Sequence, residues 1–114
     1  MTEYRRSRRR RAAEAIDVYD TMTEQSIGTI CNISESGMMM MANCKLYDDA
    51  LYQLRFTLAS GRKSHPIELG AHHLWSDGAN VPGQYWAGLR FIDISPEDST
   101  ALRAWIEQPG GQFV

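Results

Sequence analysis

The 114-residue sequence is poor in cysteine, and its two cysteines match no pattern typical of a metal site or a disulfide framework. Cys31 and Cys44 stand 13 positions apart, without a Cys-x-x-Cys pair. Unpaired cysteines of this kind are usual in reducing compartments. We therefore expect two reduced, structural thiols.

Long apolar runs are absent as well. No stretch approaches the roughly 20 apolar residues that a membrane-spanning helix needs. The arginine-rich start is followed by Ala12, Ala13 and Glu14 rather than by the apolar segment of a signal peptide. These absences predict a cytoplasmic protein that does not insert into a membrane.

The sequence also lacks the common catalytic and metal-binding motifs. His65, His72 and His73 do not have the spacing of a His-Glu-x-x-His site, and adjacent His72 and His73 would face opposite sides of a strand. Ser34 and Ser36 have no Gly-x-Ser-x-Gly context, and the glycines form no phosphate-binding loop. We therefore expect neither an enzyme nor a protein that depends on a metal or a cofactor.

Basic residues are scarce outside one segment. Residues 1–11 contain six arginines and one acid, a net charge of +5, whereas the remaining 103 residues contain six basic and thirteen acidic side chains, a net charge of −7. The overall charge of −2 thus combines a basic arm with an acidic body. Arginines this close repel one another, so the arm is stabilised most by an anionic partner.

Alternating apolar and polar residues, together with β-branched and aromatic side chains, are the main structural signal. They predict six short strands, with turns near 34–37 and 60–61 and a loop at 77–83; the strands are expected at 15–20, 27–33, 38–41, 51–58, 67–75 and 85–94.

A helix is predicted after the last strand. Ser95 is a suitable capping residue, Pro96 fits the first helical position, and the two acids that follow suit the helix dipole. Leu102, Trp105 and Ile106 then form an apolar stripe.

These elements predict a single, mainly β domain, because so short a chain supports one hydrophobic core. We expect a small six-stranded antiparallel β-barrel with a C-terminal helix and a flexible basic N-terminal arm. The expected boundaries are 1–13 for the arm, 14–108 for the barrel and helix, and 109–114 for a tail.

Two motifs carry the chemistry: the arginine run at residues 5–11 and, about 22 residues later, the Asn-x-Ser-x-x-Gly sequence at residues 32–37. An Arg-x-x-x-Arg spacing followed by this turn resembles the PilZ domain family. The segment 86–95 is similar to that family's closing strand, so the resemblance covers nearly the whole chain. It implies a bacterial receptor for the second messenger cyclic di-GMP. In such receptors the arm folds over the ligand, often an intercalated dimer, and clamps it against the barrel.

Arginine suits this ligand because its planar cation can engage a phosphate or the O6 and N7 acceptors of guanine as a pair, and can stack on a purine. The resemblance implies a binding site made of Arg5, Arg6, Arg9, Arg10, Asn32, Ser34 and Gly37, with Arg8, Arg11, Ser36 and Trp75 ranked behind them.

Each residue of the second motif has an expected role. Asn32, where the family more often has Asp, would offer its amide oxygen to guanine N–H donors. Ser34 would donate its hydroxyl to a phosphate or a base. Gly37 would allow a positive φ or a close approach of the ligand. The four-residue arginine spacing is satisfied both by Arg5 with Arg9 and by Arg6 with Arg10, and the sequence does not separate the two registers.

Two other functions are compatible with the motifs. One is a small nucleic-acid-binding protein that uses the arm on phosphates, although the acidic body makes nucleic acid a poor partner. The other is a PilZ-like adaptor that binds no nucleotide. In the favoured reading, cyclic di-GMP changes the surface offered to an unidentified effector protein, by family association in motility, biofilm or virulence control.

Overall fold

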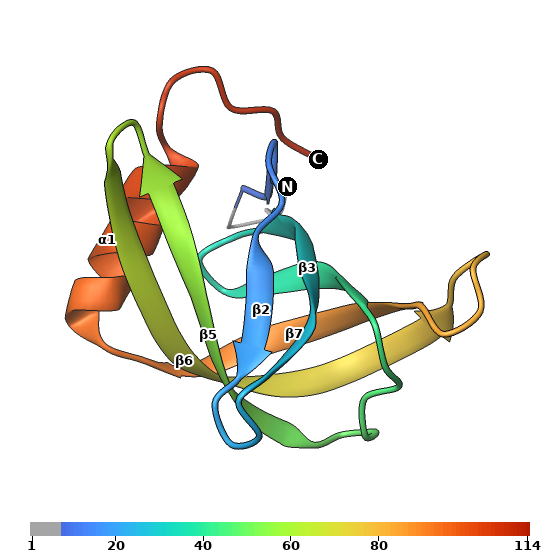
Figure 1. The fold of residues 1–114 in the computed structure, drawn as a ribbon. Helices are drawn as coiled ribbons and strands as arrows, with labels where there is room; N and C mark the ends of the chain where they lie inside the picture. The colour runs from blue at the N-terminus through green and yellow to red at the C-terminus, as the bar shows by residue number, and fades with distance from the viewer. Residues whose placement is uncertain (1–7) are drawn as a thin grey trace, which may run out of the picture.

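Six antiparallel strands close into a barrel in the computed structural model, which describes residues 8–114 (Figure 1). The strands follow the order β3-β2-β5-β6-β7-β4, and β4 pairs with β3 to complete the closure. Closure leaves the barrel without an open edge, and the expected barrel is confirmed. Its strands are β2 (Asp17–Asp20), β3 (Gln25–Ile33), β4 (Gly37–Ala42), β5 (Leu51–Ser60), β6 (Lys63–Gly78) and β7 (Tyr85–Ile94).

Strand β6 is longer than the sequence predicts. It was expected at 67–75 but spans Lys63–Gly78 and passes through Pro66. A proline is tolerated there because β6 pairs only with β5 at that point, and β7 joins the sheet first at Leu69, opposite Ile94.

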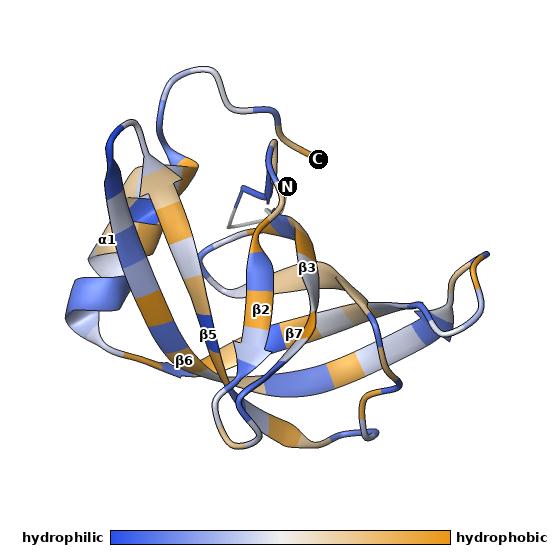
Figure 2. Cartoon of the chain, in the orientation of Figure 1, coloured by the Kyte–Doolittle hydropathy of each residue, from blue (hydrophilic) through white to orange (hydrophobic). Residues whose placement is uncertain are grey.

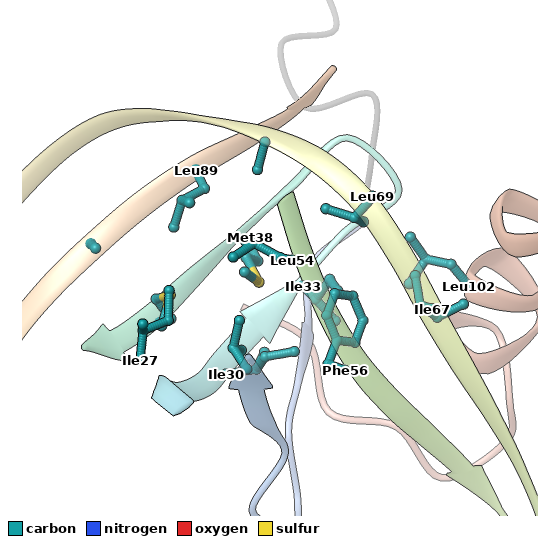
Figure 3. Packing of buried hydrophobic residues seen from close by; sticks show 14 of the residues in the cluster. Ile27, Ile30, Ile33, Met38, Leu54, Phe56, Ile67, Leu69, Leu89 and Leu102 are labelled. Atoms are coloured by element: carbon teal, nitrogen blue, oxygen red, sulfur yellow. The ribbon is translucent and has the colours of Figure 1, made fainter. Parts of the chain in front are cut away.

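The barrel interior is filled by alternate side chains of the strands. Figure 2 shows the hydropathy changing along strands such as β2 and β5. Met38 and Met40 point inward and are buried, while Met39 and Met41 are half-buried on the outer face. Other large buried side chains are labelled in Figure 3 and include Ile33, Leu54, Phe56, Ile67 and Leu89.

Helix α1 (Pro96–Ile106) starts as predicted, with Ser95 as its cap. The Ser95 hydroxyl accepts a hydrogen bond from the Asp98 N–H at 3.1 Å. The Asp98 carboxylate accepts one from the Glu68 N–H at 3.0 Å, which ties the start of the helix to β6. Leu102, Trp105 and Ile106 are buried, so the apolar stripe packs on the barrel as expected.

Two residues of the described part of the arm form a strand. Arg10–Arg11 form a short strand, β1, whose residues pair with Ile33 and Asn32 of β3. The Ala12 N–H donates to the Cys31 carbonyl at 3.0 Å. Within the arm that was expected to be flexible, Arg10–Arg11 thus add one extra strand to the sheet beside the end of β3.

No helix within residues 8–114 is long and apolar enough to cross a lipid bilayer.

Candidate ligand-binding site

The candidate site lies on the outer face of the barrel, where four strands run side by side. The sheet register places Asn32 of β3 opposite Met39 of β4, Met39 opposite Gly88 of β7, and Gly88 opposite Trp75 of β6. Residues directly opposite each other in a sheet share a face. These four residues therefore form a row across the outside of the barrel.

A cavity of about 240 Å³ opens above this row. Asn32 and Trp75 lie at its two ends, and Arg9 and Val114 also line it. It thus gathers Arg9, Asn32 and Trp75, three of the residues that the sequence predicted, around one space.

Arg9 connects the two sequence motifs. Its Nη1 donates a hydrogen bond to the Asn32 Oδ1 at 3.1 Å, although the two residues are 23 positions apart. The contact is possible because β1 lies along the end of β3, with Arg11 opposite Asn32. The arginine run and the Asn-x-Ser-x-x-Gly turn therefore meet at the cavity.

Arg10 points away from the cavity. Its Nη1 donates to the backbone carbonyls at the end of helix α1, at 3.0 Å from Trp105, 3.3 Å from Ile106 and 2.8 Å from Gln108. Its guanidinium also lies 4.9 Å from the centre of the Trp105 ring. Such a cation satisfies carbonyls that lack partners within the helix.

The other described arginines of the run, Arg8 and Arg11, also do not line the cavity. Arg8 lies over the ring of Phe113, 3.8 Å from its centre, and Arg11 is exposed. Alternation along an extended chain explains why Arg8 and Arg10 share one side while Arg9 faces the other. Arg5 and Arg6 lie outside the described residues.

Ser34 holds the turn of the second motif. Its side chain is buried, and its hydroxyl oxygen accepts hydrogen bonds from the N–H groups of Ser36 and Gly37, both at 3.2 Å. The Ser34 N–H donates to the Gly37 carbonyl at 2.8 Å. Ser36 is exposed, and its hydroxyl lies 3.2 Å from that of Ser34. In this structure the Ser34 hydroxyl is engaged within the turn.

Gly37 is needed for a reason that the sequence did not reveal. It is not among the glycines with positive φ, so the first of its two expected roles is wrong. A Cβ at this position would lie 2.5 Å from the Leu89 carbonyl oxygen of β7. The glycine therefore lets the β4 and β7 backbones approach each other.

Gly88 and Met39 belong to the site but were not among the sequence candidates. A Cβ on Gly88 would lie 2.2 Å from the Trp75 Nε1, so the indole rests directly against the glycine backbone. Trp75 is 44% exposed and forms a wall of the cavity. The sequence did contain a signal for Gly88. A glycine inside an aromatic-rich strand often marks a place where another group packs closely against the backbone.

We predict that Gly88→Ala displaces the Trp75 indole at little cost in stability. The obstructing atoms belong to an exposed side chain that can rotate away, so the free energy of unfolding should change by less than about 1 kcal/mol. The indole N–H resonance of Trp75, assigned with Trp75→Phe, should shift in an NMR spectrum. Gly78→Ala is the control, since a Cβ there meets nothing within 4 Å. An unmoved Trp75 resonance in Gly88→Ala would contradict this packing.

Cys31 lies in an irregularity of β3 immediately before Asn32. Burial raises the pKa of its thiol, and a hydrogen bond with the Met41 backbone offsets this only in part. Burial and the nearby Asp20 charge also raise the pKa of the Cys44 thiol. Both cysteines are free, and their thiols are protonated at neutral pH.

The adjacent histidines face opposite sides of β6, as predicted. His73 is buried and its Nδ1 lies 2.7 Å from the Tyr47 carbonyl, whereas the partly exposed His72 contacts the Asp49 carboxylate. Among residues 8–114, no three His, Cys, Asp or Glu side chains gather as they would around a metal ion.

Comparisons with known proteins agree with this architecture. The family model described as the PilZ domain matches residues 3–108. No curated protein matches the chain. Among solved structures, the inhibitor of motility MotI/DgrA of Bacillus subtilis superposes with a TM-score of 0.75 at 19% identity, over 92% of this chain and 50% of that one.

The PilZ domain of YcgR from Escherichia coli with c-di-GMP superposes with a TM-score of 0.70 at 16% identity, over 91% of this chain and 89% of that one. YcgR of Escherichia coli in complex with c-di-GMP gives 0.67 at 14% identity, over 90% and 44%. The chain thus spans about half the length of MotI/DgrA and less of the YcgR chain. At these identities the likeness shows the shared fold.

Proposed function

This chain belongs to the PilZ domain family, and from that premise we propose that it is a receptor for cyclic di-GMP. Binding of the messenger would change the surface that the protein offers to an effector protein in a bacterial cytoplasm. In this role the protein is a receptor or adaptor rather than an enzyme.

The observation that carries the proposal is the meeting of the two motifs. Arg9 and Asn32 are joined by a hydrogen bond of 3.1 Å, and both line a cavity whose far end is the partly exposed Trp75. A cation, an amide and an aromatic face are the groups that a guanine nucleotide needs for its phosphate, its base edge and its base plane. The structures of YcgR with c-di-GMP support the choice of ligand.

The size of the cavity indicates how the ligand would lie. At about 240 Å³ it is smaller than the roughly 300–1,000 Å³ of most ligand pockets. A molecule with two guanines would therefore fill it with one end only and extend over the outer face of the barrel. We propose that the arm, including Arg5 four residues before Arg9, covers the remainder.

The proposal assigns distinct tasks to the predicted residues. Arg9, Asn32 and Trp75 contact the ligand, Ser34 and Gly37 shape the turn beside it, and Arg10 anchors the arm. Arg11 and Ser36 are exposed near the site and remain candidates for further contacts.

Calorimetric titration of the whole chain with cyclic di-GMP tests the proposal and reports the stoichiometry, including a ligand dimer. We expect saturable binding that weakens as salt concentration rises, because charged groups recognise a phosphodiester. GMP is the control ligand, since it offers one guanine, and should bind far more weakly. Absence of heat with cyclic di-GMP, together with tight binding to arbitrary single-stranded RNA in a gel shift, would favour the nucleic-acid function instead.

A further inference from the structure

The arm is paired along both of its edges. On one side β1 joins β3, and on the other the chain after helix α1 turns back and runs antiparallel to it, as the red segment in Figure 1 shows. We call residues 109–114 the return segment. Its Phe113 lies opposite Arg10, the Arg11 N–H donates to the Gln112 carbonyl at 2.7 Å, and the Val114 N–H donates to the Arg9 carbonyl at 2.9 Å.

Side-chain contacts stabilise this pairing of the arm with the return segment. The Phe113 ring lies under the Arg8 guanidinium at 3.8 Å and packs against the core. Arg10 reaches across to the carbonyls at the end of α1. A Cβ on Gly111 would lie 2.8 Å from the Cζ and Nη1 of Arg10, so a larger residue at this position would displace this guanidinium.

These contacts determine which arginine faces the cavity. In an extended segment, a slip of one residue moves every side chain to the opposite face. A run of six arginines in seven positions would look nearly the same after such a slip. The surroundings of Arg10 distinguish the two registers. Its side chain contacts three backbone carbonyls and the Trp105 ring, and with Arg10 held there Arg9 faces Asn32.

We propose that Arg10, Gly111 and Phe113 are positioning residues for the ligand site. They hold the arm in the register that presents Arg9, rather than Arg10, to the cavity. This inference rests on the proposed function. Its physical basis is that the return segment orders Arg9 before the ligand arrives, so less conformational entropy is lost on binding.

The decisive variant is Phe113→Ala, which leaves the net charge unchanged. Any loss of affinity then comes from arm geometry rather than from weaker attraction of the anionic ligand. We expect cyclic di-GMP to bind about tenfold more weakly. Gln112→Ala is the matched control, because that side chain is exposed and its backbone carbonyl is retained, and it should stay within about twofold of wild type. Phe113→Tyr keeps an aromatic face for Arg8 and should restore binding.

A double-mutant cycle separates positioning from general stability. If Phe113 acts through Arg9, then Phe113→Ala should weaken binding no further in an Arg9→Ala background, as measured by NMR titration. Equal losses in both backgrounds would overturn the inference. Unchanged affinity for Phe113→Ala would also overturn it, and tighter binding would show that the return segment obstructs the ligand.

Hydrogen exchange of the ligand-free protein tests the register without any ligand. The Arg11 amide, which donates to Gln112, should exchange about tenfold faster in Phe113→Ala while the amides of β6 are unaffected. Unchanged exchange at Arg11 overturns the inference even if the receptor function holds. A wild-type chain that does not bind cyclic di-GMP would instead refute the proposed function. Hydrogen exchange of the Arg11 amide would then still show whether Phe113 holds the arm in place.

Discussion

Replacing Arg9 with alanine is expected to weaken cyclic di-GMP binding roughly a hundredfold. Arg9 is half-buried and lines the cavity, and its guanidinium is already oriented by the hydrogen bond to Asn32 at 3.1 Å. Hydrogen bonds that involve a charged group contribute about 1.5–3 kcal/mol, and about 2.7 kcal/mol corresponds to a hundredfold change in affinity. One or two such bonds to a phosphate or a guanine edge account for the effect.

The matched control is Arg62→Ala. Arg62 is exposed in the turn between β5 and β6 and does not line the cavity, yet its loss changes the net charge by the same amount. It should therefore leave affinity within about twofold of wild type. Equal affinities for Arg9→Ala and Arg62→Ala would contradict the assignment of Arg9 to the ligand.

Arg10→Ala should behave differently from Arg9→Ala. Removing Arg10 takes away the side-chain donor to the Trp105, Ile106 and Gln108 carbonyls, so the free energy of unfolding should fall by about 1–2 kcal/mol. Arg9→Ala should lower it less, since it removes the hydrogen bond to Asn32 but none of the three bonds to the end of α1. This difference in stability, measured by thermal denaturation without ligand, separates the anchoring arginine from the ligand-binding one.

Gly37→Ala is expected to destabilise the protein by about 1–3 kcal/mol, with or without ligand. The added Cβ would lie 2.5 Å from the Leu89 carbonyl oxygen, a backbone atom that pairs β7 with β4. A backbone oxygen cannot rotate away as the Trp75 ring can, so relief requires two barrel strands to move apart. Because these strands help to close the barrel, the strain acts on the whole fold.

Chemical denaturation of ligand-free protein measures this effect, with Gly78→Ala as the control for adding a methyl group to an open position. A single cooperative transition at lower denaturant concentration is the expected result. If Gly37→Ala kept wild-type stability but lost cyclic di-GMP binding, Gly37 would be a ligand contact rather than a closure residue.

Much of the fold could be predicted from the sequence because its signals are local. Alternation over a few residues marked the strands, and Ser95 with the acids behind it marked the start of the helix. The spacing of Asn32 and the arginine run also named them as candidate ligand-binding residues, and the structure brings Arg9 and Asn32 together. The hydroxyl of Ser34 was the part that could not be assigned, because whether it bonds a ligand or its own turn depends on the folded backbone.

The sequence by itself thus determined the barrel, the helix and the two motifs. Only the tertiary structure decided how the motifs meet. Arg9 and Arg10 are chemically identical neighbours, and what distinguishes them is a set of carbonyls that lie 95 to 98 positions further along the chain. Local patterns carry no information about partners so distant, because the pairing of the arm with the return segment exists only once the barrel and its helix have formed.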